Sequence, residues 1–401
     1  MIPISEAIAI VLEQTHVLGV EAVALPEANG RVLAQNIVAD TDLPPFDRAQ
    51  MDGYAVRAAD VATTPARLRI VGESAAGAGW HQEMKPGEAV RIMTGAPVPA
   101  GADAVQQVEL TRELNGGGEV EILASVQAGR SIVKQADEIK SGELVLRAGE
   151  EINTQTIATL ASFGYAQVSV GKRPRVAVMA TGSELVDVNQ RPGRDQIRDS
   201  NNYSIEAYAR LAGAEVQRLP LAGDDRDLLK QQIADAIEDC DVLITSGGVS
   251  MGVYDYTKTA FRELGAEIYF ERVALRPGKP TVFGRMRETL FFGLPGNPVS
   301  VAVTFNLFAH AALWKMQGGT KTYLREVQAV LARDVKGTRE RDSYLPAVLR
   351  TDEKGTLLAE PLKWGGSSDF VSFARATGLV FIAADRSEVA GTVVKCLVLP
   401  A

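Results

Sequence analysis

The sequence is poor in the residues that build disulfide frameworks and metal clusters. Its 401 residues include two cysteines, Cys240 and Cys396, and three histidines. The cysteines do not form a CxxC pair, so we expect neither a disulfide framework nor a cysteine zinc site. His16, His81 and His310 are scattered along the chain, and we interpret them as surface or packing residues. This composition fits a reducing compartment.

The chain also lacks an excess of positive charge. Its 42 Lys and Arg residues stand against 50 Asp and Glu residues, which gives a net charge of −8. Nucleic acids attract proteins with basic surfaces, so this balance argues against a nucleic acid as the main partner.

A signal peptide and a membrane span are not expected either. The N-terminal apolar pattern carries Glu6 and has no basic segment before it, unlike a signal peptide. The longest apolar helix candidate, Val299–Met316, is interrupted by Asn306, His310 and Lys315. We predict that it is a buried helix, and we expect a cytoplasmic protein without a membrane partner.

Length and patterning predict a multidomain α/β protein, because 401 residues are too many for one core. We expect a doubly wound, mostly parallel sheet domain, an inserted small β domain and a C-terminal β domain. The segment Ser5–Leu18 has apolar residues at helical spacing, with Ser5 as the predicted N-cap. The predicted boundaries are 1–45 with 136–172 for the N-terminal helix and connecting domain, 46–135 for the inserted domain, 173–318 for the sheet domain and 319–401 for the C-terminal domain.

The sheet domain is predicted from strands that alternate with helices after Arg175. The strands "RVAVMATG", "DVLITSGG" and "ETLFFGLPGNP" are apolar throughout, which is typical of a parallel sheet covered on both faces. Ligands of such sheets bind beyond the carboxyl ends of the strands. We therefore expect the loops that follow these strands to carry the chemistry.

Four of these loops combine glycines with polar or acidic residues. They are "ATGSEL" (180–185), "LAGDDRD" (221–227), "TSGGVSMGVYD" (245–255) and "GLPGNPVS" (293–300). Glycines let a phosphate approach the backbone, and carboxylates beside a phosphate are the ligands that Mg²⁺ prefers. In the fourth loop Asn297 suits an N-cap and Pro298 the first helical position, so the helix would offer N–H groups to an anion.

Each of these loops also has a purely structural interpretation. A glycine pair at a strand end can be a tight turn, and an Asp at a helix start can be a cap. The functional interpretation gains weight because all four loops should lie on one edge of one sheet. There is no GxxxxGK[ST] motif and no GxGxxG after the first strand, which excludes a P-loop NTPase and makes a nicotinamide site unexpected.

Three further segments are dense in polar residues, proline and glycine. In "RPGKPTVFG" (276–284), Arg276 and Lys279 form either a solvated turn or a grip for an oxyanion. "PPFDRAQMDGYAV" (44–56) holds Asp52, and "RIMTGAPVPAGADAV" (91–105) holds Thr94. The structural interpretation of the first is a linker into the inserted domain, and the second is interpreted as an ordered loop with available backbone amides.

Together the motifs resemble one family. "LPPFDRAQMDGYAV", "RIMTGAPVPAGADAV", "TGSEL", "ITSGGVSMGVYDYTK", "RPGKPTVFG" and "GLPGNPVS" follow one another in this order. The chain resembles, over nearly its whole length, the molybdopterin molybdenumtransferases, the MoeA family that includes the E domain of gephyrin.

The resemblance implies an enzyme that hydrolyses adenylylated molybdopterin with Mg²⁺ and inserts molybdate into the dithiolene. The products would be molybdenum cofactor and AMP. The resemblance also implies a homodimer, in which the inserted domain of one subunit approaches the cleft of the other. The adenylyltransferase of the same pathway is a further candidate partner.

The resemblance also implies roles for individual residues. Asp224 and Asp255 would position Mg²⁺ and pyrophosphate, and Glu184 would serve the metal or the molybdate step. Asp52 and Thr94 would act from the partner subunit. The residues expected to bind substrate are Gly182, Ser183, Ser246, Gly247, Gly248, Ser250, Arg276, Lys279, Pro295, Asn297, Pro298, Ser300, Ser367 and Ser368.

The chain departs from the family pattern at two places. The family's "GxDI"-like stretch is "QADEIKSG" (135–142) here, which leaves the roles of Asp137 and Glu138 open. Many members have an Arg where this chain has Pro346, so the oxyanion site is expected to be weaker or built differently. A tungstate-selective insertase, or a non-catalytic pterin-binding scaffold, remains an alternative.

Overall fold

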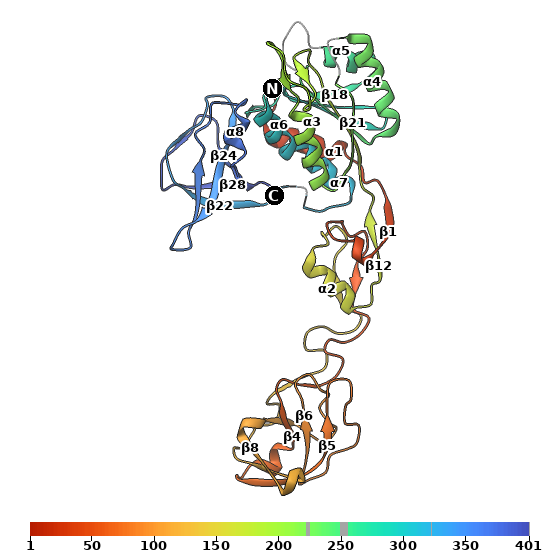
Figure 1. The fold of residues 1–401 in the computed structure, drawn as a ribbon, viewed down its shortest axis with the longest axis vertical. Coiled ribbons are helices and arrows are strands. Elements are labelled where there is room, and N and C mark those ends of the chain that lie inside the picture. The colour runs from red at the N-terminus through yellow and green to blue at the C-terminus, as the bar shows by residue number, and fades with distance from the viewer. Residues whose placement is uncertain (222–224, 249–255, 322, 401) are drawn as a thin grey trace. The chain divides into compact units, whose positions relative to one another are not determined.

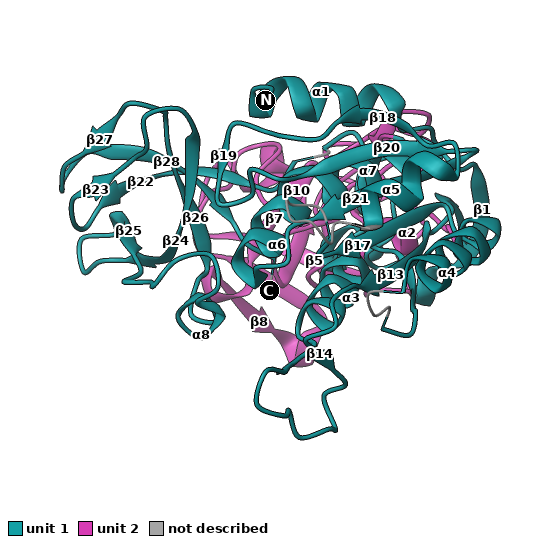
Figure 2. Cartoon of the chain, turned by 90° about the horizontal axis from the view of Figure 1, so that it is seen from above, with its two compact units in different colours: residues 1–35, 148–157, 166–401 teal, residues 36–147, 158–165 magenta. Residues whose placement is uncertain are grey.

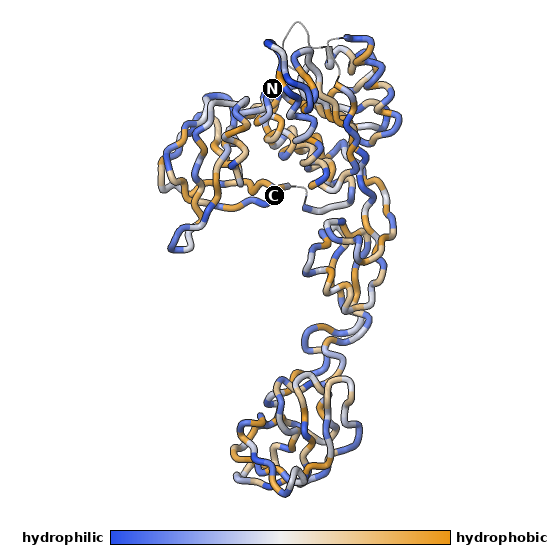
Figure 3. Tube along the Cα trace, viewed as in Figure 1, coloured by the Kyte–Doolittle hydropathy of each residue, from blue (hydrophilic) through white to orange (hydrophobic). Residues whose placement is uncertain are grey.

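The computed structural model describes residues 1–221, 225–248, 256–321 and 323–400. The chain divides into two compact units, which Figure 2 colours separately. Unit 1 comprises residues 1–35, 148–157 and 166–401, and unit 2 comprises residues 36–147 and 158–165. Each unit has its own apolar cores, and hydrophobic stretches occur throughout both (Figure 3).

Unit 1 contains a six-stranded sheet of the order β16-β13-β17-β21-β20-β18. The first four strands are parallel, and β20 and β18 complete the sheet in antiparallel fashion. This confirms the mostly parallel sheet predicted from the apolar strands. The strands are β13 (Arg175–Ala180), β16 (Glu215–Arg218), β17 (Val242–Ser246), β18 (Glu267–Phe270), β20 (Val282–Met286) and β21 (Thr289–Leu294).

Helices cover both faces of this sheet (Figure 1), and alternate residues of β13 show why. Val176 and Val178 enter the core shared with α1, α3, α6 and α7, whereas Ala177 and Met179 enter the core shared with α4 and α5. A strand with both faces buried has no polar alternation. The helices are α1 (Ile4–Gln14), α3 (Asn201–Leu211), α4 (Arg226–Asp239), α5 (Tyr256–Glu263), α6 (Pro298–Thr304) and α7 (His310–Met316).

Two helix starts test the capping predictions. The expected N-cap Ser5 is wrong by two residues, because α1 begins at Ile4 and Pro3 is its N-cap, whose carbonyl accepts from the Ala7 N–H group at 3.0 Å. At α4 the side chain of Asp225 accepts hydrogen bonds from the Asp227 and Leu228 N–H groups, both at 3.0 Å, as an Asp cap should.

The predicted buried helix before Met316 is confirmed. Helices α6 and α7 are joined by a π-helical turn, Phe305–Ala309, into one segment, Pro298–Met316. Length and composition alone would allow this segment to cross a membrane, but 89% of its most apolar window is buried inside unit 1. It is the central helix of the core.

The C-terminal part of unit 1 is a β barrel. Its strands follow the order β24-β25-β22-β28-β26, and a further pairing of β24 with β26 closes the ring. The strands are β22 (Glu326–Leu331), β24 (Asp342–Thr351), β25 (Leu357–Pro361), β26 (Gly378–Ile382) and β28 (Val393–Val398). A short strand from the sheet domain, β19 (Leu275–Arg276), pairs in parallel with the beginning of β24. Val335–Lys336 (β23) and Ser387–Glu388 (β27) form a separate two-stranded ladder.

The remaining strands of unit 1 are short pairs. β1 (Val20–Ala24) pairs with β12 (Gln167–Gly171), and β14 (Leu185–Val186) pairs with β15 (Ile197–Arg198). The chain's second helix is α2 (Thr154–Ser162), and a short α8 (Phe370–Phe373) follows the barrel strand β25.

Unit 2 is a small β domain. Its main sheet has the order β7-β4-β6-β5-β9-β8 and buries Tyr54, Val56 and Ile122. The strands are β4 (Gly53–Val56), β5 (Ala66–Ser74), β6 (Glu88–Ile92), β7 (Ala104–Gln107), β8 (Thr111–Leu114) and β9 (Glu119–Ile122). Unit 2 also contains two further pairs, β3 (Arg48–Ala49) with β10 (Ile132–Val133) and β2 (Ile37–Val38) with β11 (Leu144–Leu146).

The glycine pair after β17 is required by the backbone. Gly247 has a φ of +87°, and a Cβ atom there would lie 2.5 Å from the Thr181 carbonyl oxygen. Its N–H group donates to the Leu294 carbonyl at 3.2 Å, so Gly247 joins the ends of β17 and β21. The backbone alone therefore requires a glycine at this position, and its N–H group is already in use.

We predict that Gly247→Ala destabilises unit 1 more than Gly265→Ala does. Both residues have positive φ, which costs an alanine about 1–2 kcal/mol. A Cβ at Gly265 meets nothing within 4 Å, whereas at Gly247 it meets backbone, so a further loss is expected there. Thermal unfolding of the two variants measures the difference, and equal midpoints would contradict it.

Candidate active site

The loops at the carboxyl ends of the parallel strands line one cavity of about 880 Å³, which we call the strand-end cavity. It contains six of the residues predicted from the sequence. These are Glu184, Ser246, Gly247, Asn297, Pro298 and Ser368. Three of the four predicted loops therefore meet at one sheet edge, whereas the described residues of the loop 221–227 do not line this cavity.

Unpartnered polar atoms point to a polar ligand in the strand-end cavity. Ser246 Oγ and Asn201 Oδ1 are buried, belong to residues that line the cavity, and have no hydrogen-bond partner among the described residues. A buried polar group without a partner costs roughly 1–3 kcal/mol. A ligand with donors and acceptors in this cavity would remove that cost.

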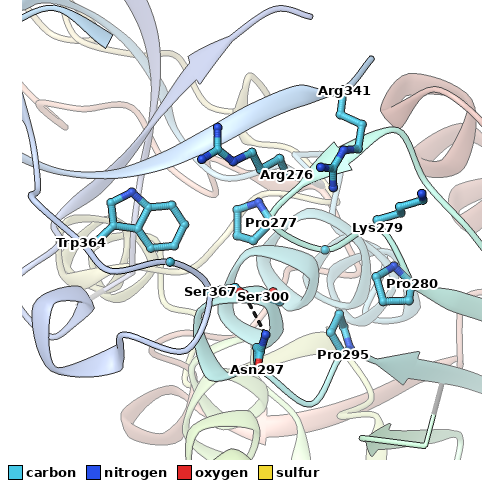
Figure 4. A pocket seen from close by; sticks show the side chains of 12 residues that line it. Arg276, Pro277, Lys279, Pro280, Pro295, Asn297, Ser300, Arg341, Trp364 and Ser367 are labelled. Atoms are coloured by element: carbon cyan, nitrogen blue, oxygen red, sulfur yellow. Dashed lines mark hydrogen bonds between the residues drawn. The ribbon is translucent and has the colours of Figure 1, made fainter. Parts of the chain in front are cut away.

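A second cavity of about 290 Å³ lies where the sheet domain meets the barrel. We call it the cation pocket, because the side chains of Arg276, Lys279 and Arg341 line it together (Figure 4). None of the three forms an ion pair with another residue in the described part of the chain. The predicted residues Pro295, Asn297, Ser300 and Ser367 also line it.

Ser367 fixes the loop that walls the cation pocket. Its carbonyl oxygen accepts from the Val299 N–H group at 3.0 Å, and its Oγ accepts from Asn297 Nδ2 at 2.7 Å (Figure 4). Asn297 is the N-cap of α6, as predicted, but its side chain binds Ser367 instead of capping the helix. The first N–H group of α6 is thereby occupied by protein, and the remaining polar character of the pocket comes from its cations.

Asp369 holds the same loop from its other end. Its carboxylate accepts from the N–H groups of Gly365 at 2.8 Å and Ser372 at 3.0 Å. These hydrogen bonds, with Gly365 first, hold the pKa of Asp369 below its usual value. The loop between Gly365 and Ser372, which carries Ser367 and Ser368, is therefore ordered by one charged side chain.

The two cavities adjoin each other, since Asn297 lines both. Three predicted residues, Gly182, Ser183 and Gly248, are described but do not line either cavity. Gly182 lies against the carboxylate of Glu184, because a Cβ there would be 2.3 Å from Glu184 Oε2. Asp224, Ser250 and Asp255 lie outside the described residues.

Of the three predicted metal ligands, Glu184 is the one that lies within the described residues. Its carboxylate is exposed on the wall of the strand-end cavity, where an oxygen ligand is available to a cation. Within residues 1–221, 225–248, 256–321 and 323–400, no three His, Cys, Asp or Glu side chains are grouped to hold a metal ion. The other two predicted ligands are Asp224 and Asp255, outside those ranges.

Asp52 and Thr94, in unit 2, lie together. The Thr94 N–H group and hydroxyl both donate to Asp52 Oδ1, at 2.7 and 2.8 Å. These bonds lower the pKa of Asp52, the N–H bond contributing most, so that the exposed carboxylate stays ionised. The pair joins the two motif loops that the sequence singled out, at 44–56 and 91–105.

Sequence reasoning missed several residues that line the cavities. Arg341 and Trp364 line the cation pocket, and Asp199 and Asn201 line the strand-end cavity. The available signal for the last two was "RDSNN" (198–202), a polar run directly before α3. Pro346, the departure from the family pattern, lies in β24 opposite Leu379 and does not line the cation pocket, whose third cation is Arg341.

Asp199 is the most unusual carboxyl group of the strand-end cavity. Its side chain is buried, and this burial raises its pKa against the opposing effect of hydrogen bonds from Asn202 and Asn201. The native state therefore binds the Asp199 proton more tightly than the unfolded chain does. At pH values above the folded pKa, ionised Asp199 lowers the free energy of unfolding. This cost is gone once the pH falls below about 3.9, the ordinary pKa of Asp, because the carboxyl group is then protonated in both states.

Comparisons with known proteins agree along the whole chain. Residues 2–164 match the model of the MoeA N-terminal region (domains I and II), residues 177–315 the probable molybdopterin binding domain, and residues 328–399 the MoeA C-terminal region (domain IV). A molybdopterin molybdenumtransferase of Bacillus subtilis is 36% identical over 95% of this chain and 90% of its own length. One from Staphylococcus aureus is 36% identical over 95% and 91%.

Solved structures give the same result for the fold. A crystal structure of the molybdopterin biosynthesis MoeA protein from Pyrococcus horikoshii OT3 has a TM-score of 0.85 at 29% identity. A second structure from that organism has a TM-score of 0.80 at 32% identity. Both comparisons cover 100% of each chain.

We predict that Asp199→Asn raises the thermal midpoint at pH 7 and loses this advantage near pH 4. The amide keeps an oxygen acceptor for the Asn202 N–H group, whose bond to Asp199 Oδ1 is 3.1 Å, and it removes the buried charge. Asp195→Asn, at an exposed carboxylate of the same segment, is the control and should change neither midpoint. A gain of equal size at both pH values would contradict the burial argument.

Proposed function

The chain belongs to the MoeA family of molybdopterin molybdenumtransferases, the transferases of molybdenum cofactor biosynthesis. From this premise we propose how its residues divide the steps of the reaction among them. The substrate is adenylylated molybdopterin, the adenylate is hydrolysed to AMP, and molybdate enters the dithiolene. The observation that supports this division is that Asn297 lines both the strand-end cavity and the cation pocket. A substrate bound in the first cavity lies next to an anion bound in the second.

The strand-end cavity takes the pterin substrate. Its volume of about 880 Å³ lies within the range of roughly 300–1,000 Å³ found for small-molecule sites. Asp199, Asn201 and Ser246 offer buried oxygen atoms to the polar edge of a heterocycle. Two glycines of the strand-end loops, Gly247 and Gly296, line this cavity and leave room for a pyrophosphate beside the backbone.

Magnesium would be held at the same edge by Glu184 together with Asp224 and Asp255. Such an ion neutralises the charge that develops on a phosphate as its bond breaks. Of these three carboxylates, the one within the described residues is that of Glu184. Ser250, a predicted substrate-binding residue, belongs to the same loop as Asp255. Asp52 and Thr94 would complete the site from the partner subunit of a homodimer.

The cation pocket takes the oxyanion. Arg276, Lys279 and Arg341 supply three positive charges without partner acids among the described residues, and Ser300 and Ser367 line the same space. Guanidinium groups bind tetrahedral oxyanions through two parallel N–H bonds, and lysine adds a point charge. The adenylyltransferase of the pathway would supply the substrate, and both proteins would act in the cytoplasm.

The function is tested by incubating the protein with adenylylated molybdopterin, Mg²⁺ and either molybdate or tungstate. AMP release and protein-bound metal are measured in each arm. Release of AMP with both oxyanions, but retention of molybdenum alone, supports the molybdate insertase. Retention of tungsten alone supports the tungstate enzyme, and absence of AMP in both arms supports a non-catalytic scaffold.

We predict that Asp255→Ala reduces AMP release at least about 100-fold, because an electrostatic stabiliser of the transition state is removed. The thermal midpoint should stay within a few degrees of the unsubstituted protein. Glu288→Ala, at an exposed acid in the turn between β20 and β21, is the matched control and should release AMP normally. Full activity of Asp255→Ala would disprove the metal assignment.

Arg341→Ala and Lys279→Ala are predicted to raise the molybdate concentration for half-maximal insertion by about tenfold or more. The reason is that each removes a charge-assisted bond, worth roughly 1.5–3 kcal/mol. The requirement for the pterin substrate should change much less. Arg339→Ala removes an exposed cation two residues from Arg341 and serves as the control. An unchanged molybdate dependence in Arg341→Ala would show that Arg341 does not take the place of an arginine at position 346.

A further inference from the structure

A third cavity, of about 390 Å³, lies in the C-terminal barrel and has no role in the proposed reaction. We call it the barrel cavity. Its cationic lining is Arg333, Lys336 and Lys363, and apolar walls come from Leu345 and Trp364. Arg333 is half-buried, and the two lysines are exposed.

The cationic side chains that line the barrel cavity outnumber its acidic side chains three to one. None of its three cations forms an ion pair with any residue that the structure describes. The one acid in its lining, Asp334, accepts a hydrogen bond from the Ala390 N–H group at 2.8 Å. The chain as a whole carries a net charge of −8, so this local excess of cations stands out. A concave surface on which one sign of charge predominates concentrates ions of the opposite sign.

The shape and chemistry of the barrel cavity narrow the class of anion. The cavity is larger than the cation pocket, which already accommodates a tetrahedral oxyanion in the proposed function. Its apolar walls would gain nothing from a small inorganic ion. An indole beside cations is instead the combination that binds nucleotides, because a base stacks on the ring and the phosphate meets the charges.

We propose that the barrel cavity is a binding site for a nucleoside monophosphate. The phosphate lies against Lys336, Lys363 and Arg333, and the base lies against Trp364. AMP is the nucleotide of choice because the proposed function releases it, and the proposal rests on that function in this one respect.

Trp364 connects this site to the cation pocket, since it lines both. It belongs to a loop that also carries Lys363 on the barrel side and Gly366 and Ser367 on the pocket side. A nucleotide that stacks on Trp364 therefore contacts a wall of the oxyanion site. AMP bound in the barrel cavity would change the molybdate affinity of the cation pocket, and molybdate would change the AMP affinity by the same factor.

The test is equilibrium binding of AMP to the whole protein, without pterin substrate or molybdate. Binding is measured by calorimetry and by tryptophan fluorescence. Lys336→Ala and Lys363→Ala should each weaken AMP binding about tenfold or more. Lys354→Ala, at an exposed lysine of the barrel that does not line the cavity, should bind as the unsubstituted protein does. Fluorescence quenching by AMP should disappear in Trp364→Phe. Absence of AMP binding, or AMP affinity that neither lysine variant changes, would overturn the proposal.

Two further arms separate the classes of ligand. Inorganic phosphate and adenosine are each titrated, and AMP should bind at least about tenfold more tightly than either. Phosphate binding as tight as AMP binding would show a simple oxyanion site and would contradict the nucleotide assignment. Because no turnover is measured, a failure of AMP binding is distinct from a failure of AMP release in the insertase assay.

Discussion

The arrangement of the candidate site depends on one short backbone pairing between the sheet domain and the barrel. Strand β19 is two residues long, and it lies parallel to the first residues of β24, with Leu275 opposite Asp342 and Arg276 opposite Ser343. The Asp342 N–H group also donates to the Ala274 carbonyl at 3.0 Å. Because Arg341 directly precedes β24, this pairing places it beside Arg276 although 65 positions separate them in the chain.

A second connection between the sheet domain and the barrel fixes the wall of the cation pocket that faces the β19–β24 pairing. Ser367 from the barrel loop binds Val299 and Asn297 at the start of α6. Three like charges in one small pocket repel one another, so a flexible framework would let them move apart. The β19–β24 pairing holds the backbone that carries Arg276 and Arg341, and the Ser367 bonds hold the facing wall. A framework fixed in this way arranges charges for an anion before it arrives, which is the condition for strong electrostatic binding.

The sequence predicted the strand-end cavity well because a simple geometric rule applies to it. Parallel strands end at one edge, so residues after β13, β17 and β21 had to meet, and Glu184, Ser246 and Asn297 do line one cavity. No comparable rule connects β19 to β24, because a two-residue strand has no periodic pattern. Arg341 and Trp364 were therefore missed. Asp199 was missed for a different reason: it lies before α3 and not in a loop that directly follows a strand of the parallel sheet.

Pro346, the departure from the family pattern in β24, has a structural role that only the fold reveals. A proline in a strand cannot donate to a neighbour, and it is tolerated where its carbonyl alone is needed. Here the Pro346 carbonyl accepts from the Leu362 N–H group at 2.8 Å, which anchors the loop leading to Trp364 and Ser367. The residue therefore supports the wall of the cation pocket through its backbone. The positive charge of the pocket comes from Arg276, Lys279 and Arg341, so the pocket holds three cations without a charged residue at position 346.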